Sequence, residues 1–147
     1  MNVQRYSADD FMDMDALHDH YVTDISLDNN TLIIKYDHLD WISGPEGLPQ
    51  YEYKSLAIKY DFRSFCDVTL FYENNKYKCI DLLKKKSVFD KLTKKFEIQS
   101  YKYSVDSFGE ITMHFWGTKY RKNSRKILCS LSMEIHMDAK EISYYWN

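Results

Sequence analysis

The sequence predicts an α+β protein that is mainly β: an antiparallel meander of about eight or nine short strands with one or two short helices. Most of the chain alternates apolar and polar residues, as half-buried strands do. Two Asn-Asn dipeptides separate such runs, which is typical of tight hairpins. Aromatic residues make up 16% of the chain, against only four glycines and two prolines, and this favours strands. A curved sheet, a two-sheet sandwich and an open barrel all fit this periodicity.

The 147 residues suffice for one domain with a sizeable core, so we expect residues 1–147 to fold as a single domain. Strands do not alternate with long helical segments, so the sheet should be antiparallel. The only Gly/Pro-rich stretch, residues 43–49, is a loop too short to be an interdomain linker.

The first predicted element is a short helix near the N-terminus. Ser7 and Asp10 have the spacing of a capping box, and Phe11, Met14 and Leu17 would share one side. Its start is strongly acidic, with Asp9, Asp10, Asp13 and Asp15. These acids either complement the helix dipole or form an acidic contact surface for a partner.

A hairpin follows, with strands at about residues 21–28 and 31–38 joined by Asn29-Asn30. If Asp28 faces Thr31, the register pairs apolar residues with each other and acid with base, as cross-strand energetics favour. The predicted pairs are Leu27 with Leu32, Ile25 with Ile34, and Asp24 with Lys35.

Another strand is predicted at residues 56–62, and a second hairpin at residues 67–81 around Asn74-Asn75. Pairing Glu73 with Lys76 would set an acid opposite a base, as Asp24 faces Lys35 in the first hairpin. The same register sets Tyr72 against Tyr77 and Leu70 against Cys79.

The C-terminal half predicts a short amphipathic helix and four strands. The helix is expected at about residues 88–95, and the strands at about 97–105, 110–117, 126–138 and 141–146. The 126–138 strand alternates most cleanly; its apolar face would carry Ile127, Cys129, Leu131, Met133, Ile135 and Met137.

No catalytic or metal signature stands out, so the sequence predicts a protein that is not an enzyme and needs no cofactor. The nearest approach to a metal cluster is His18, His20 and Asp24, which would share a face of a strand. Against it, the predicted register already gives Asp24 a partner in Lys35. A nucleophile elbow and a glycine-rich phosphate loop are both missing.

The cysteines predict reduced thiols. Cys66, Cys79 and Cys129 are odd in number, far apart and without a CxxC pair. The N-terminus lacks the pattern of a signal peptide, and no apolar run approaches the ~20 residues of a membrane-spanning helix. We therefore expect a cytoplasmic protein with no membrane partner.

Two surfaces remain as candidates for binding. The basic stretches at residues 84–95 and 119–126 could grip phosphates, but a net charge of −2 favours solvated loops and makes nucleic acid an unlikely partner. The polar strand faces carry aromatics, with Trp116 beside His114, and Tyr145. Such aromatics either serve as hot spots for a protein partner or are covered by the helices.

The segment from Leu17 to Trp41 resembles the opening of several small bacterial proteins, some of which are grouped as immunity proteins of polymorphic toxin systems. The resemblance rests on Leu17, His18, Asp19, Ile25, Leu27, Asn30, Leu32 and Ile34. It implies a cytoplasmic, non-enzymatic, β-rich protein that binds and blocks a cognate toxin. The acidic segment and exposed aromatics fit a basic protein partner. The alternatives are a binder of small molecules or carbohydrates in an aromatic-lined concavity and, third, a nucleic-acid-binding protein.

Overall fold

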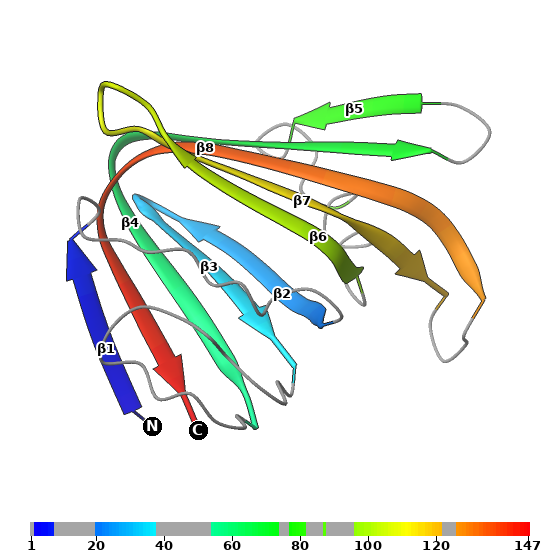
Figure 1. The fold of residues 1–147 in the computed structure, drawn as a ribbon, viewed down its shortest axis with the longest axis horizontal. Coiled ribbons are helices and arrows are strands. Elements are labelled where there is room, and N and C mark those ends of the chain that lie inside the picture. Colours follow the sequence, from blue (N-terminus) through cyan, green and yellow to red (C-terminus); the bar gives the residue numbers. More distant parts are fainter. Residues whose placement is uncertain are drawn as a thin grey trace.

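In the part of the chain that the structure describes, eight strands form one antiparallel sheet (Figure 1). The computed structural model describes residues 2–7, 20–37, 54–73, 77–81, 87, 96–121 and 126–147. The strands are β1 (Asn2–Ser7), β2 (Tyr21–Asp28), β3 (Thr31–Tyr36), β4 (Leu56–Glu73), β5 (Tyr77–Asp81), β6 (Phe96–Val105), β7 (Ile111–Tyr120) and β8 (Ile127–Trp146). The predicted mainly β, antiparallel architecture is therefore confirmed.

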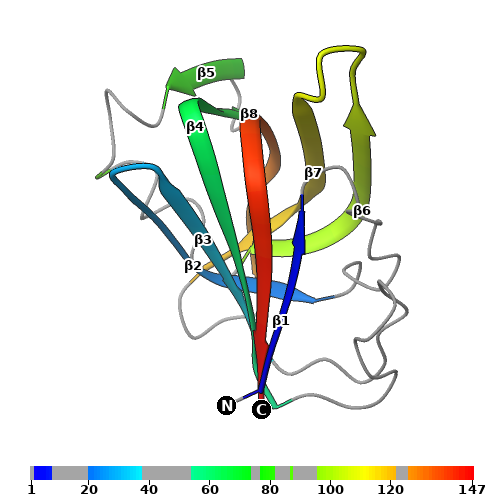
Figure 2. The same ribbon diagram turned by 90° about the vertical axis from the view of Figure 1, so that its left-hand side faces the viewer.

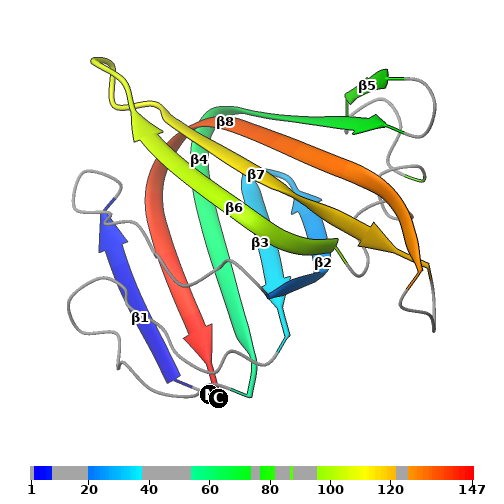
Figure 3. The same ribbon diagram turned by 45° about the vertical axis from the view of Figure 1, so that its right-hand side comes forward.

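The sheet folds back on itself and closes around the core. The strand order is β1-β8-β7-β6-β2-β3-β4-β5, and β8 also pairs with β4, so six strands from β8 round to β4 make a closed circuit. Among the described residues, the shortest pairing in this circuit is between β2 and β6, where Tyr21 pairs with Glu97 and Val22 with Phe96. Away from that link the sheet has two halves: β1, β2 and β3 lie in one, β5, β6 and β7 lie in the other, and β4 and β8 run through both. The β2–β3 and β6–β7 hairpins point away from each other in Figure 2, and β6 and β7 lie across β2 and β3 in Figure 3.

Two long, bent strands carry the chain from one half of the sheet to the other (Figure 1). On β4, Phe62 pairs with Ala139 and Cys66 with Met137, so residues 63–65 lie opposite Asp138 alone. On β8, Lys140 is the extra residue between the partners of Asp61 and Phe62. Bulges of this kind bend a strand and increase its twist.

The first hairpin has the predicted register. Leu27 pairs with Leu32, Ile25 with Ile34 and Asp24 with Lys35. The Lys35 ammonium lies 3.2 Å from the Asp24 carboxylate. Asn29 has a φ of 49°, the left-handed conformation that asparagine tolerates better than most residues. Turn chemistry and cross-strand pairing therefore sufficed to predict this hairpin.

The turn of this hairpin also contacts the bend of β4. The N–H of Phe62 donates to the carbonyl oxygen of Asn30 at 3.0 Å. The side-chain amide of Asn30 donates to the carbonyl oxygen of Arg63 at 2.8 Å. Asn30 therefore links β2 and β3 to the bend of β4, a role that its place in the turn does not reveal.

The predicted register of the second hairpin is wrong by one residue. Glu73 pairs with Tyr77 rather than Lys76, and Leu70 pairs with Ile80 rather than Cys79. The observed register sets the buried Leu70 opposite another aliphatic residue. Where one face of a strand is buried, the apolar pattern of the strand fixes the register. Here that pattern outweighs the predicted pairing of Glu73 with Lys76 at the turn.

Four of the predicted strand segments merge into two strands that are longer than the periodicity predicts. The segments expected at 56–62 and 67–73 form one strand, β4, and those expected at 126–138 and 141–146 form another, β8. A bulge interrupts the alternation of sides in the same way as a strand end does, so the pattern suggests two strands where there is one.

The structure contains an unexpected strand where a helix was expected to begin. Ser7, the expected helix cap, is the last residue of β1, an edge strand that pairs with the end of β8. The rest of that helix, and the helix expected at residues 88–95, lie outside the described residues. Every element with described bounds is a strand.

The core lies inside the folded sheet and collects the inward side chains of six strands. Its largest fully buried side chains are Tyr60, Tyr144, Phe96, Phe115, Leu32 and Ile34. Burying each large apolar side chain contributes about 1.5–3 kcal/mol. Burial also raises the pKa of Tyr36 and Tyr60 well above the usual range, so both phenols stay neutral.

Candidate functional site

The polar and aromatic side chains of the candidate site lie mainly on the outer face of β7 and β8. Inward residues of both strands are buried, and the alternate residues point outward. We call this surface the outer β7–β8 face; its residues are Thr112, His114, Trp116, Ser132, Glu134 and His136. The strand register pairs Thr112 with His136, His114 with Glu134, and Trp116 with Ser132.

Trp116 and His114 form a stacked pair on this face. Their rings lie 5.3 Å apart at an interplanar angle of 10°. The Nδ1 of His114 lies 3.6 Å from the carboxylate of Glu134. The pair therefore combines a flat aromatic surface with an imidazole next to a negative charge.

Small residues flank Trp116 on both neighbouring strands. Ser100 of β6 pairs with Trp116 on one side, and Ser132 of β8 pairs with it on the other. Trp116 is 39% exposed, whereas the next inward residues of the same strand, Phe115 and Gly117, are buried. An exposed tryptophan between two serines is available for contact with another molecule.

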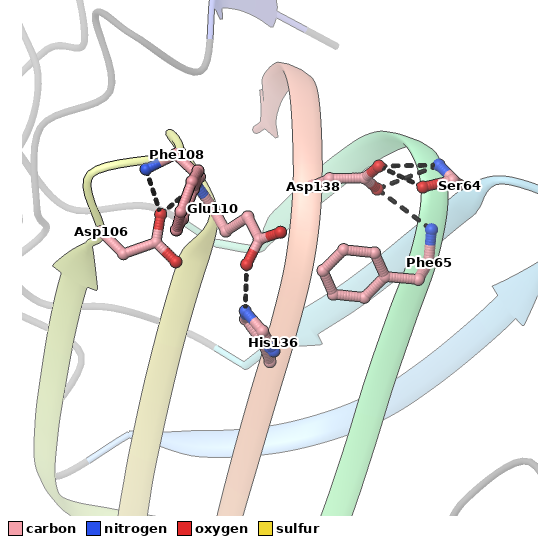
Figure 4. Close-up of polar contacts among 7 residues, drawn as sticks. All are labelled: Ser64, Phe65, Asp106, Phe108, Glu110, His136 and Asp138. Carbon is pink, nitrogen blue, oxygen red and sulfur yellow. Dashed lines mark hydrogen bonds and ion pairs between the residues drawn. The ribbon is translucent and has the colours of Figure 1, made fainter.

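Asp106, Glu110 and His136 gather at one end of the face. Asp106 and Glu110 belong to the connection between β6 and β7, and His136 lies on β8 (Figure 4). Each offers a ligand atom, and the three atoms lie within 4.8 Å of one another. The Nε2 of His136 is 3.0 Å from a carboxylate oxygen of Glu110. We call these residues the carboxylate–imidazole cluster.

The backbone of its own turn orients Asp106. One carboxylate oxygen accepts the N–H groups of Phe108 at 2.8 Å and Glu110 at 3.0 Å. Desolvation by itself raises the pKa of Asp106. These N–H groups, the Glu110 side chain and nearby His136 together have the larger effect, and they hold the pKa below its ordinary value. Asp106 is therefore an anion at neutral pH.

Phe65 and Asp138 connect the cluster to the bend of β4 (Figure 4). The ring of Phe65 packs edge-on against the imidazole of His136, with 5.0 Å between ring centres. The carboxylate of Asp138 accepts the N–H groups of Ser64 and Phe65 at 3.0 Å, together with the Ser64 hydroxyl. The same bend that folds the sheet therefore orients the imidazole.

These hydrogen bonds also set the acidity of Asp138. Desolvation raises the pKa of this carboxyl group, but the Ser64 hydroxyl and the N–H groups of Phe65 and Ser64 have the larger effect and lower it to about 2.

The structure separates the residues that the sequence proposed for partner binding. His114 and Trp116 lie together on the outer β7–β8 face, as their spacing predicted. Tyr145 lies on β8 beyond the bend, where it pairs with Val3 and Ala57, so it belongs to the other half of the sheet. The acidic residues Asp9, Asp10, Asp13 and Asp15 lie outside the described part of the chain.

The spacing argument for a metal site at His18, His20 and Asp24 does not hold along β2. The register shifts between Val22 and Asp24, and buried positions fall at Val22 and Ile25, three residues apart. Alternation therefore does not continue from His20 to Asp24. Asp24 instead pairs with Lys35, and His18 lies outside the described residues.

Cys66 and Cys129 are free thiols, and both are buried. The alternation of residues 126–138 predicted the burial of Cys129, whereas the burial of Cys66 was not predicted. Burial, with nearby Asp67 and Asp138, raises the pKa of Cys66 to about 12, so its thiolate is scarcely populated at neutral pH. In the basic stretch at 119–126, Lys119 is buried, while Arg121 and Lys126 are exposed.

The sequence did not suggest the carboxylate–imidazole cluster because its members share no local motif. Glu110 and His136 become neighbours only through the pairing of β7 with β8. The available signal was the hairpin itself: matching the strands expected at 110–117 and 126–138 would have placed His136 beside Thr112, close to Glu110.

Comparisons with protein-family models, with curated proteins and with solved structures find no match to this chain. Among the described residues, no helix has the length and apolar character needed to cross a membrane.

Proposed function

We propose that the chain is a non-enzymatic, cytoplasmic binding protein that presents the outer β7–β8 face to a protein partner. The single observation that carries the proposal is the exposed Trp116 stacked on His114 between two small serines. Tryptophan dominates binding hot spots because it buries a large area and loses little side-chain entropy. Neighbouring charges such as Glu134 would form the polar rim of the contact.

The partner class follows from the sequence resemblance of residues 17–41 to immunity proteins. On that basis the partner is a toxin domain that the chain binds and blocks. A basic toxin would suit both the acidic residues Asp9, Asp10, Asp13 and Asp15 and the Glu134 carboxylate on the outer β7–β8 face. The resemblance supplies the partner class, and the stacked aromatic pair supplies the contact.

Trp116→Ala is expected to weaken partner binding by about 2 kcal/mol or more, which corresponds to roughly 30-fold in Kd. The partner would first be captured from a lysate of the native host with the wild-type chain and identified by mass spectrometry. Kd would then be measured by calorimetry with both purified proteins. Tyr145→Ala is the matched control, because it removes an aromatic side chain from the other half of the sheet.

Three results would count against the proposal. Equal losses in Trp116→Ala and Tyr145→Ala would reject this face as the contact. A partner that does not harm cells when expressed alone, or whose toxicity the chain does not suppress, would reject the immunity-type role. Recovery of no stoichiometric protein partner would favour a small-molecule or carbohydrate binder, for which a thermal-shift screen is the next measurement.

The acidic segment should act mainly on the rate of association. Changing Asp9, Asp10, Asp13 and Asp15 together to Asn is expected to slow association about 10-fold at low salt and to reduce its salt dependence, because exposed charges steer partners over long distances. Stopped-flow or surface-based kinetics at two salt concentrations would measure both effects. An unchanged association rate would remove the acidic segment from the proposed contact.

A further inference from the structure

We propose that Asp106, Glu110 and His136 form a binding site for a divalent transition-metal ion of the zinc class. Imidazole nitrogen and carboxylate oxygen are ligands that zinc takes in proteins. The inference does not depend on the proposed protein partner, because it uses only the cluster's own geometry.

The three ligand atoms are already close to the spacing that a metal ion requires. They lie within 4.8 Å of one another, and His136 Nε2 is 3.0 Å from Glu110 Oε2. Bonds of roughly 2.1 Å in a tetrahedral site place ligand atoms about 3.4 Å apart. Small rotations of side chains at the surface would therefore complete three bonds and leave a fourth position open to water.

Two of the three ligands are held in place before any ion binds. Two backbone N–H groups fix one oxygen of Asp106, and the edge-on contact with Phe65 limits rotation of the His136 ring (Figure 4). Pre-ordered ligands lose less entropy on binding. Asp106 is exposed, and Glu110 and His136 are partly exposed, so an ion can reach the site from solvent.

The charges and donor types around the site also favour a cation of this class. Two carboxylates converge on one imidazole. The exposed Asp67 is the residue of β4 that lies opposite His136 in the strand register. A divalent ion would neutralise both carboxylates of the cluster. The imidazole favours zinc over calcium or magnesium, which prefer oxygen ligands alone.

Isothermal titration of the full chain with Zn²⁺ tests the site. We expect a binding event of one ion per chain that His136→Ala and Glu110→Gln each weaken by at least about 10-fold, because losing a direct ligand should cost no less than losing a supporting residue. Co²⁺ provides a second readout, with a visible absorption band that is present in the wild type and absent in His136→Ala. Ca²⁺ and Mg²⁺ should bind at least about 10-fold more weakly than Zn²⁺.

His114→Ala is the matched control. It removes a histidine from the same face that also faces a glutamate, yet it lies outside the cluster. It should therefore leave zinc affinity unchanged. Absence of saturable Zn²⁺ binding, equal losses in His114→Ala and His136→Ala, or equal affinity for Ca²⁺ would each overturn the proposal. Urea denaturation of each variant verifies that it is folded, and His136→Gln replaces His136→Ala if the latter is not.

Discussion

Gly117→Ala is expected to destabilise the fold by about 3 kcal/mol or more. A Cβ on Gly117 would lie 1.8 Å from the carbonyl oxygen of Glu97 and 2.7 Å from Cε2 of Phe96. Neither neighbour can move cheaply, because one is backbone of β6 and the other is a fully buried ring. The only relief is to separate β6 from β7.

Separating β6 from β7 would also disturb the pairing of β6 with β2 that closes the sheet. Phe96 and Glu97 are also the β6 residues that pair with Val22 and Tyr21 of β2, the short link that completes the circuit of six strands. Displacing them weakens two pairings at once, so a one-carbon substitution should affect the entire fold. Typical domains have only about 5–15 kcal/mol of stability to lose.

Urea denaturation followed by tryptophan fluorescence would measure the effect. Gly109→Ala is the matched control: Gly109 has a φ of +76° with open space around it, so only backbone strain of about 1 kcal/mol is expected there. A Gly117→Ala variant as stable as the wild type would show that β6 and β7 do not approach as closely as described.

Asp138→Asn is expected to cost about 2 kcal/mol at neutral pH and to reduce the loss of stability in acid. The carboxylate accepts hydrogen bonds from two backbone N–H groups and one hydroxyl at the bend of β4. An amide offers one acceptor oxygen in place of two and turns its own donors toward those N–H groups. Part of the bend would therefore lose its hydrogen-bond partners.

The direction of the pH effect follows from the pKa of Asp138. This pKa is lowered from 3.8 to about 2 in the folded chain, so the folded state favours the ionised form. The stabilisation is present above about pH 4 and disappears as the pH falls from 4 towards 2, where the folded protein must also take up the proton. Asp138→Asn cannot titrate at this position, so its stability should fall less over that interval.

Urea denaturation at pH 5 and pH 2.5 would test this prediction, with Glu141→Gln as the control. Glu141 is an exposed acid on the same strand. Equal acid sensitivity in the wild type and Asp138→Asn would contradict the assigned role. Because Phe65 belongs to the same bend and contacts His136, the variant should also weaken zinc binding at the proposed site.

The sequence by itself determined the local architecture. Alternation predicted the antiparallel strands, and the Asn29-Asn30 turn with its flanking apolar and charged pairs predicted the register of the first hairpin. The same alternation placed His114 and Trp116 on one outward face. These features depend on neighbours in sequence, where a period of two and the chemistry of a turn suffice.

The tertiary structure decided everything that depends on contacts between distant strands. The bends at residues 63–65 and at Lys140 resemble strand ends in the sequence, and only pairing across β4 and β8 reveals them as bulges in continuous strands. Strand β1 exists because the end of β8 offers it an edge. The cluster of Asp106, Glu110 and His136 requires the register between β7 and β8, which the alternation within each strand does not fix. Several strand registers are compatible with the local sequence. Pairing between distant strands decides which one forms, because burial of the whole apolar face, rather than any single turn, fixes the register.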